Sequence, residues 1–208
     1  GGTAYKEWVQ RWNDHGFAAI SIAVEGQTDE PDLAAPTHKR EWKRHPWAGP
    51  KRTGIYDDTT EPLTEQWIYH AVADTVLANS LLRSLPDVDE RTIGVMGVSW
   101  GGVIACSAIG IDSRFAFAIV TYGCGHMFDS HNQWGRALRD HTVYREVWDP
   151  IARMSRVNMP VLWLSWPEDQ HFPLDCQAAT YRAAPGPRMV SLIPGMGHSH
   201  PAAWTRPE

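Results

Sequence analysis

An α/β fold, with a mostly parallel sheet and helices on both faces, is predicted for this chain from three observations. Helix-like and strand-like segments alternate along the sequence, which is the pattern of β–α–β units. Residues 17–24 (FAAISIAV) form a continuous apolar run, as expected for a strand buried on both faces. A chain of 208 residues fits one domain with a single core. We therefore treat residues 1–208 as one domain.

Four segments are predicted before Pro86. Trp8 and Trp12 lie at helical spacing, and Gly16 marks the end of that helix. A longer helical pattern begins at "TEQW" and ends before Pro86, because proline cannot continue a helix. The stretch between residue 24 and this second helix is rich in proline, glycine and charged residues. The predicted elements are a helix over 3–15, a strand over 17–24, a loop over 25–63 and a helix over 64–85.

After Pro86, apolar strand-like runs and helical patterns follow one another closely. Residues 124–158 interrupt this pattern, since they lack strand character and contain Trp134 and Pro150. We interpret them as helical and irregular structure, a lid or insertion that covers one edge of the sheet. The remaining predicted elements are strands over 91–98, 115–123, 160–166 and 188–195, and helices over 100–110 and 174–184.

Composition argues against several classes of partner. The formal net charge of -5 gives no electrostatic basis for binding nucleic acid or an anionic membrane. No run approaches the roughly 18 apolar residues that a membrane span requires. The three cysteines show no C-x-x-C spacing, so neither a disulfide framework nor a zinc finger is predicted.

One short motif stands between a predicted strand and a predicted helix. Residues 97–101 (GVSWG) satisfy G-x-S-x-G, with Ser99 at its centre. A sharp turn there would strain the serine backbone and lift its hydroxyl above the sheet, and we expect Gly97 and Gly101 to be small because a Cβ at either would collide. The following helix would direct its free N–H groups at the same point. The motif indicates a nucleophilic serine.

A nucleophilic serine needs a base, and the base needs an acid that orients it. Asp169 follows the predicted strand 160–166, and His198 follows the predicted strand 188–195. Because parallel strands end at the same edge of a sheet, both should approach Ser99. Their order along the chain, serine then acid then histidine, is the order of α/β-hydrolases. We predict Ser99, Asp169 and His198 as a catalytic triad.

Alternatives exist for the acid and the base. Glu168 adjoins Asp169, and Asp129 follows another predicted strand, so either carboxylate is a second choice. His200 is the alternative to His198, which we prefer because Gly197 lets the chain turn the ring inward.

Metal binding is the competing interpretation of the histidines. His126, His131 and His171 lie in loops predicted at the same edge, and "HSH" places two more nearby. No H-E-x-x-H or Cys/His ligand spacing occurs, so we predict neither a catalytic metal nor another cofactor.

Several short segments of the sequence together resemble those of a known group of proteins. "GVMGVSWGG", "YGCG", "PVLWLSWPEDQHFP" and "PGMGHSHP", with the first 22 residues, are similar to α/β-hydrolases of the acetyl xylan esterase, dienelactone hydrolase and prolyl oligopeptidase-like group. The resemblance implies an eight-stranded sheet with an oxyanion loop, often "HGGGG", before the first helix. Only Gly1 and Gly2 of such a loop are present here, so the first strands of that fold are expected to be missing.

The motifs and the resemblance lead to a functional prediction. A serine esterase would hold the oxyanion with the Trp100 N–H and with an N–H from the Gly1–Gly2 region. The expected substrate is a small-molecule or carbohydrate ester, since aromatic faces can pack on sugar or aryl rings. A serine peptidase, an acyltransferase and a catalytically silent binding domain are the alternatives. The candidate substrate-binding residues are Trp42, Trp47 and Trp134.

Overall fold

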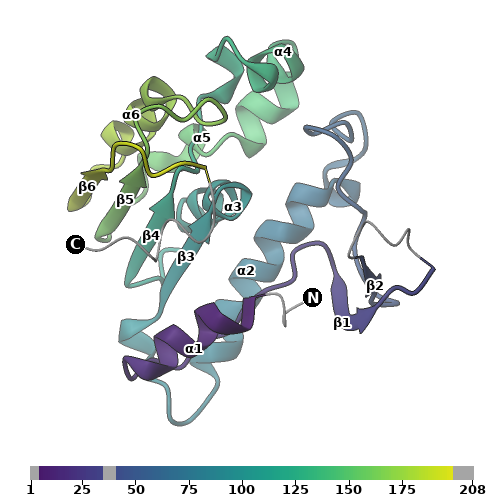
Figure 1. The fold of residues 1–208 in the computed structure, drawn as a ribbon, viewed down its shortest axis with the longest axis vertical. Coiled ribbons are helices and arrows are strands. Elements are labelled where there is room, and N and C mark those ends of the chain that lie inside the picture. Colours follow the sequence, from purple (N-terminus) through teal and green to yellow (C-terminus); the bar gives the residue numbers. More distant parts are fainter. Residues whose placement is uncertain (1–4, 35–40, 199–208) are drawn as a thin grey trace.

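The structure, a computed structural model, describes residues 5–34 and 41–198 (Figure 1). Its centre is a sheet of four parallel strands, which neighbour one another in the order in which they occur in the chain. This matches the four strands predicted after Pro86, with each strand a few residues shorter than its apolar run. The strands are β3 (Gly94–Val98), β4 (Phe117–Thr121), β5 (Val161–Ser165) and β6 (Arg188–Leu192).

The helices also agree with the sequence prediction. The helices predicted over 64–85 and 100–110, on the two sides of the serine motif, form as α2 and α3, and these two helices pack on each other. Short helical turns connect the longer elements. The α-helices are α1 (Lys6–Asp14), α2 (Trp67–Arg83), α3 (Trp100–Ile109), α4 (Gln133–Leu138), α5 (Ile151–Met154) and α6 (Leu174–Ala183). The turns are η2 (Leu63–Glu65), η3 (Glu90–Thr92), η4 (Met127–Asp129) and η5 (Tyr144–Trp148).

Alternation along β5 shows how the sheet is covered. Val161, Trp163 and Ser165 are buried, whereas the residues between them are partly exposed. Ala118 and Val120 of β4 are buried and pair with Val161 and Trp163, so these side chains line the same face. The helices α3 and α6 contact β3, β4 and β5. The core therefore lies between one face of the sheet and these helices, and it holds the strand ends that carry the site.

The prediction of a strand over 17–24 is wrong. The segment forms no strand, and Phe17 and Ile20 are each 44% exposed. A strand needs a neighbour for its backbone hydrogen bonds. Within the described residues β3 pairs with β4 alone, and the segment 17–24 has no strand as a partner that would hold it extended.

The loop predicted over 25–63 contains regular structure that the sequence pattern did not indicate. Two short antiparallel strands, β1 (Gln27–Pro31) and β2 (Trp42–Arg44), form a hairpin beside α2 (Figure 1). Both are polar and largely exposed, so they lack the apolar alternation by which strands are recognised in a sequence.

Residues 124–158 hold η4, α4, η5 and α5, which agrees with the helical and irregular structure expected there. Their packing joins distant parts of the chain, since the Trp148 indole N–H donates a hydrogen bond to the Gln66 side chain just before α2. Their role as a lid remains a prediction. In the parts of the chain that the structure describes, no helix is both long and apolar enough to cross a bilayer.

Candidate active site

Ser99 occupies the sharp turn between β3 and α3. Its backbone has φ 58° and ψ -121°, a region that residues other than glycine rarely adopt. The Ser99 N–H donates to the carbonyl of Thr121 at 3.0 Å, and the Ser99 carbonyl accepts from the N–H groups of Gly102 at 2.9 Å and Val103 at 3.1 Å. These bonds hold the strained turn from both sides and present the hydroxyl at the end of the strand.

The two glycines of the motif are not equivalent. A Cβ at Gly97 would lie 2.0 Å from the carbonyl oxygen of Gly101, so position 97 has no room for a side chain. Apart from its chain neighbours and the nearby backbone of α3, a Cβ at Gly101 would meet no heavy atom within 4 Å among the residues that the structure describes. The expectation of a collision is right for Gly97 and wrong for Gly101, because only the former faces the backbone of α3.

His198 lies between the other two predicted triad residues. Its Nε2 is 2.9 Å from the Ser99 Oγ, and its Nδ1 is 2.8 Å from the Asp169 Oδ2. A carboxylate can only accept a hydrogen bond, so Nδ1 carries the proton and Nε2 accepts from the serine hydroxyl. The three side chains follow β3, β5 and β6, whose carboxyl ends meet at one edge of the sheet.

Asp169 is 4% exposed, and its carboxylate is fully engaged. While Oδ2 faces His198, Oδ1 accepts the backbone N–H of His171 at 2.8 Å and that of Phe172 at 3.1 Å. These donors compensate the cost of burying the carboxylate and fix its orientation toward the imidazole.

Aromatic side chains and a glycine position the His198 ring. The Tyr122 ring lies 4.6 Å from the imidazole at an angle of 30°, and the Phe172 ring stacks 5.8 Å away at 15°. The Tyr122 hydroxyl donates to the carbonyl of Gly197 at 3.1 Å, and Gly197 has φ +76°, as the inward turn of the chain requires. Sequence reasoning missed Tyr122 and Phe172, although Tyr122 directly follows β4 and Phe172 lies three residues after the acid.

The alternative carboxylates bond elsewhere. Glu168 accepts the backbone N–H of Gly195 at 3.4 Å, and thereby supports the loop before His198. Asp129 lies 3.4 Å from the imidazole of His126. His200, the alternative base, lies outside the described residues.

The histidines expected at this edge do not form a metal centre in the described part of the chain. His171 contacts His198, with 4.8 Å between ring centres, but its Nδ1 accepts a hydrogen bond from Gln133. Across residues 5–34 and 41–198, no three His, Cys, Asp or Glu side chains are placed to hold an ion.

Trp100 begins α3, so its N–H has no acceptor within the helix and is available at the turn beside Ser99. The Trp100 indole packs edge-on against Trp67, at 5.5 Å, and against Trp134, at 4.7 Å. Gly1 and Gly2, the predicted source of the second oxyanion N–H, lie outside the described residues.

The three tryptophans predicted to bind substrate occupy different environments. Trp134 is 6% exposed and connects Trp100 to Phe172, with 5.3 Å between the latter rings. It therefore packs between the residue after the nucleophile and the ring that stacks on His198. Trp42 is partly buried in β2, and Trp47 is 90% exposed just after it. Binding of substrate by Trp42 and Trp47 stays a prediction.

Comparison with known protein families gives the family of this chain. The family model for acetyl xylan esterase matches residues 2–149, well over half of the chain. The chain belongs to the acetyl xylan esterase family. The matched region includes Ser99 and its motif, whereas Asp169 and His198 follow it, so the geometry alone joins them to the serine.

Solved structures related to this acetyl xylan esterase family member share its α/β-hydrolase fold. The acetyl xylan esterase from Paenibacillus sp. R4 has a TM-score of 0.73 at 24% identity, over 96% of this chain and 66% of that one. Acetyl xylan esterase 1 from Thermoanaerobacterium sp. JW/SL YS485 has a TM-score of 0.60 at 21% identity, over 73% of this chain and 55% of that one. An acylaminoacyl peptidase from Pyrococcus horikoshii has a TM-score of 0.52 at 21% identity, over 61% of this chain and 23% of that one. The chain thus spans less than two thirds of the length of each.

Proposed function

We propose that this protein is a serine hydrolase that cleaves carboxylic esters, with Ser99 as nucleophile, His198 as general base and Asp169 as the acid that orients it. The observation that carries the proposal is the unbroken pair of hydrogen bonds from Ser99 through His198 to Asp169, at 2.9 and 2.8 Å. A histidine that merely filled the core would not need both ring nitrogens aligned in this way.

The first half of the reaction forms an acyl-enzyme. As the Ser99 Oγ attacks the ester carbonyl, its proton passes to His198 Nε2, and Asp169 stabilises the imidazolium. The Trp100 N–H donates to the oxyanion of the tetrahedral intermediate, and a donor from the Gly1–Gly2 region would be its second partner. The C–O bond of the ester then breaks, and the proton on Nε2 moves to the departing alkoxide.

The second half regenerates the enzyme. A water molecule gives a proton to His198 Nε2 and attacks the acyl carbonyl, and the bond from that carbonyl to Ser99 Oγ breaks as the proton returns to the serine. The acid is released. Family membership favours an acetyl ester on a carbohydrate as the substrate.

An active-site label tests the assignment of the nucleophile. A fluorophosphonate probe should label the protein at one serine, and Ser99→Ala should abolish the label. Ser107→Ala is the matched control, because Ser107 is buried in α3 with its hydroxyl bonded to the Val103 carbonyl. Equal labelling of the Ser99→Ala protein would contradict the proposal.

Substrate class is tested separately. We expect hydrolysis of p-nitrophenyl acetate and release of acetate from acetylated xylan, and no cleavage of peptide anilides. Cleavage of the anilides in preference to the acetate would favour a peptidase instead.

A further inference from the structure

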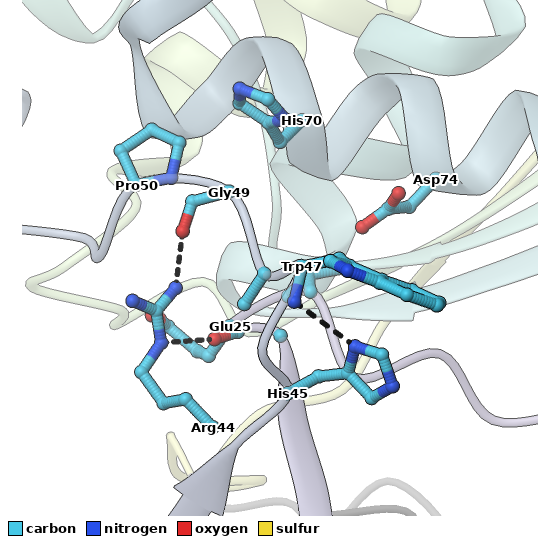
Figure 2. A pocket seen from close by; sticks show the side chains of 11 residues that line it. Glu25, Arg44, His45, Trp47, Gly49, Pro50, His70 and Asp74 are labelled. Carbon is cyan, nitrogen blue, oxygen red and sulfur yellow. Dashed lines mark hydrogen bonds between the residues drawn. The ribbon is translucent and has the colours of Figure 1, made fainter.

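A small polar pocket lies between the β1–β2 hairpin and α2, and none of the triad residues lines it (Figure 2). Its volume is about 190 Å³. This is below the roughly 300–1,000 Å³ of pockets that enclose drug-sized ligands, so the pocket suits one small group, such as a single sugar ring. The side chains that define it chemically are Glu25, Arg44, His45, Trp47, His70 and Asp74.

Trp47 is the most unusual member of this pocket. Its side chain is 90% exposed, and it is the only tryptophan within the described residues that is exposed rather than buried or partly buried. Such an indole contributes little to the core, and its apolar face stays available to a ligand. Its position is fixed locally, since the Trp47 backbone N–H donates to His45 Nδ1 at 3.2 Å and the two rings are 5.3 Å apart.

Polar groups with unused hydrogen-bonding capacity surround the indole. His45 Nδ1 accepts a hydrogen bond, so the neutral ring carries its proton on Nε2 and can donate. Asp74 lies one helical turn after His70 on α2, and among the described residues its carboxylate has neither an ion pair nor a hydrogen bond. Figure 2 shows the Trp47 indole edge-on, with Asp74 on one side of it and His45 on the other.

Arg44 and Glu25 are held by contacts within the pocket walls. Arg44 donates to the carbonyl of Glu25 at 3.2 Å and to that of Gly49, and so ties the two walls together (Figure 2). The Glu25 carboxylate pairs with Arg52 at 3.0 Å. With Arg44 and Glu25 occupied, the pocket offers an aromatic face, one carboxylate and an imidazole donor. The aromatic face and the carboxylate suit a polyhydroxylated ligand, and the charge of Asp74 disfavours an anion beside it.

The pocket wall is also connected to the serine turn. The Arg52 guanidinium that pairs with Glu25 lies 5.0 Å from the ring centre of Trp100, the residue after Ser99. The Trp67 indole N–H donates to the carbonyl of Val24, another residue of the wall, and Trp67 packs on Trp100. A ligand in the pocket would therefore lie against a wall that is connected, through Arg52 and Trp67, to Trp100 at the nucleophile turn.

We infer that this pocket is a carbohydrate subsite, in which a neutral sugar ring packs its C–H face on the side of Trp47 that faces α2, and its hydroxyl groups donate to the Asp74 carboxylate. Binding of the sugar needs no chemistry at Ser99. Its role in holding the carbohydrate part of the substrate rests on the proposed function.

Binding is tested with xylotetraose, which carries no ester, titrated into the protein and followed by NMR. We expect saturable binding, and a Kd about tenfold higher for Trp47→Ala, given the worth of one aromatic packing contact. Leu33→Ala is the matched control, because Leu33 is also 90% exposed and lies outside the pocket. Absence of binding, equal Kd values for Trp47→Ala and the wild type, or saturation by tetramethylammonium instead of the sugar would overturn the inference.

The role in catalysis needs a second readout. Trp47→Ala should lower kcat/KM for acetylated xylotetraose about tenfold more than kcat/KM for p-nitrophenyl acetate, because only the first substrate carries a sugar. A parallel fall with both substrates would show a structural defect, and an unchanged value with both would separate the pocket from the substrate site; either overturns the subsite role. If the wild type hydrolysed neither ester yet bound xylotetraose through Trp47, the proposed function would fail and the sugar site would stand.

Discussion

The glycine before the nucleophile allows a sharp test of the serine turn. We predict that Gly97→Ala strongly destabilises the protein and that Gly101→Ala does not, although the two glycines occupy symmetrical places in the motif. At position 97 a Cβ would lie 2.0 Å from the Gly101 carbonyl oxygen, 2.3 Å from its carbonyl carbon and 2.8 Å from the Gly102 nitrogen. All three are backbone atoms of α3, so no side chain can rotate away to relieve the clash.

The magnitude follows from the kind of contact. Inserting a methyl group into a filled site commonly costs 1–3 kcal/mol, and a clash with backbone should reach the upper end, about 3 kcal/mol. For a chain of this size each kcal/mol lowers the melting temperature by about 2–4 °C, which gives a fall of about 6–12 °C. In Gly101→Ala the new methyl meets open space within α3, where alanine is favoured over glycine by up to about 1 kcal/mol.

Thermal unfolding of both variants is followed by circular dichroism. Fluorophosphonate labelling checks the site and is done roughly 20 °C below the melting midpoint of each variant, where the protein is folded. We expect Gly97→Ala to melt lower and label slowly, and Gly101→Ala to melt at or above the wild-type temperature. A Gly97→Ala protein with wild-type melting and labelling would refute the reasoning, as would equal destabilisation by the two substitutions.

Three further predictions concern the catalytic acid, the loop that carries the histidine and a buried thiol. Asp169→Asn should lower kcat on the order of 10⁴-fold, because an amide no longer holds the His198 tautomer; rapid acetate release would contradict this. Tyr122→Phe removes the bond to Gly197, so kcat should fall about three- to tenfold with KM unchanged, measured by steady-state kinetics. Burial raises the pKa of Cys176 to about 12, so the thiol should react with Ellman's reagent at pH 8 only after denaturation.

The fold after Pro86 was predictable because its signals are local. Each strand of the parallel sheet is a short apolar run, and Ser99 sits in a five-residue motif whose neighbours identify the strand before it and the helix after it. The edge of the sheet to which Asp169 and His198 come also follows from the chain order of parallel strands.

The sequence predictions failed where a strand depends on a pairing partner elsewhere in the chain. Residues 17–24 have the composition of a buried strand, yet the described residues provide no second strand beside β3 for them to pair with. The β1–β2 hairpin forms without apolar alternation, since its strands satisfy each other's backbone hydrogen bonds instead of burying side chains.

The sequence by itself determined which chemical groups this protein brings to one edge of a parallel sheet. The reason is that the apolar strands, their order and the serine motif can all be recognised from short runs of consecutive residues. Only the tertiary structure decided between adjacent candidates such as Glu168 and Asp169. It also revealed Tyr122 and Phe172 around His198, and the pocket beside Trp47. These depend on distances of a few ångströms between side chains far apart in the chain, and such distances are set by packing, which no local pattern encodes.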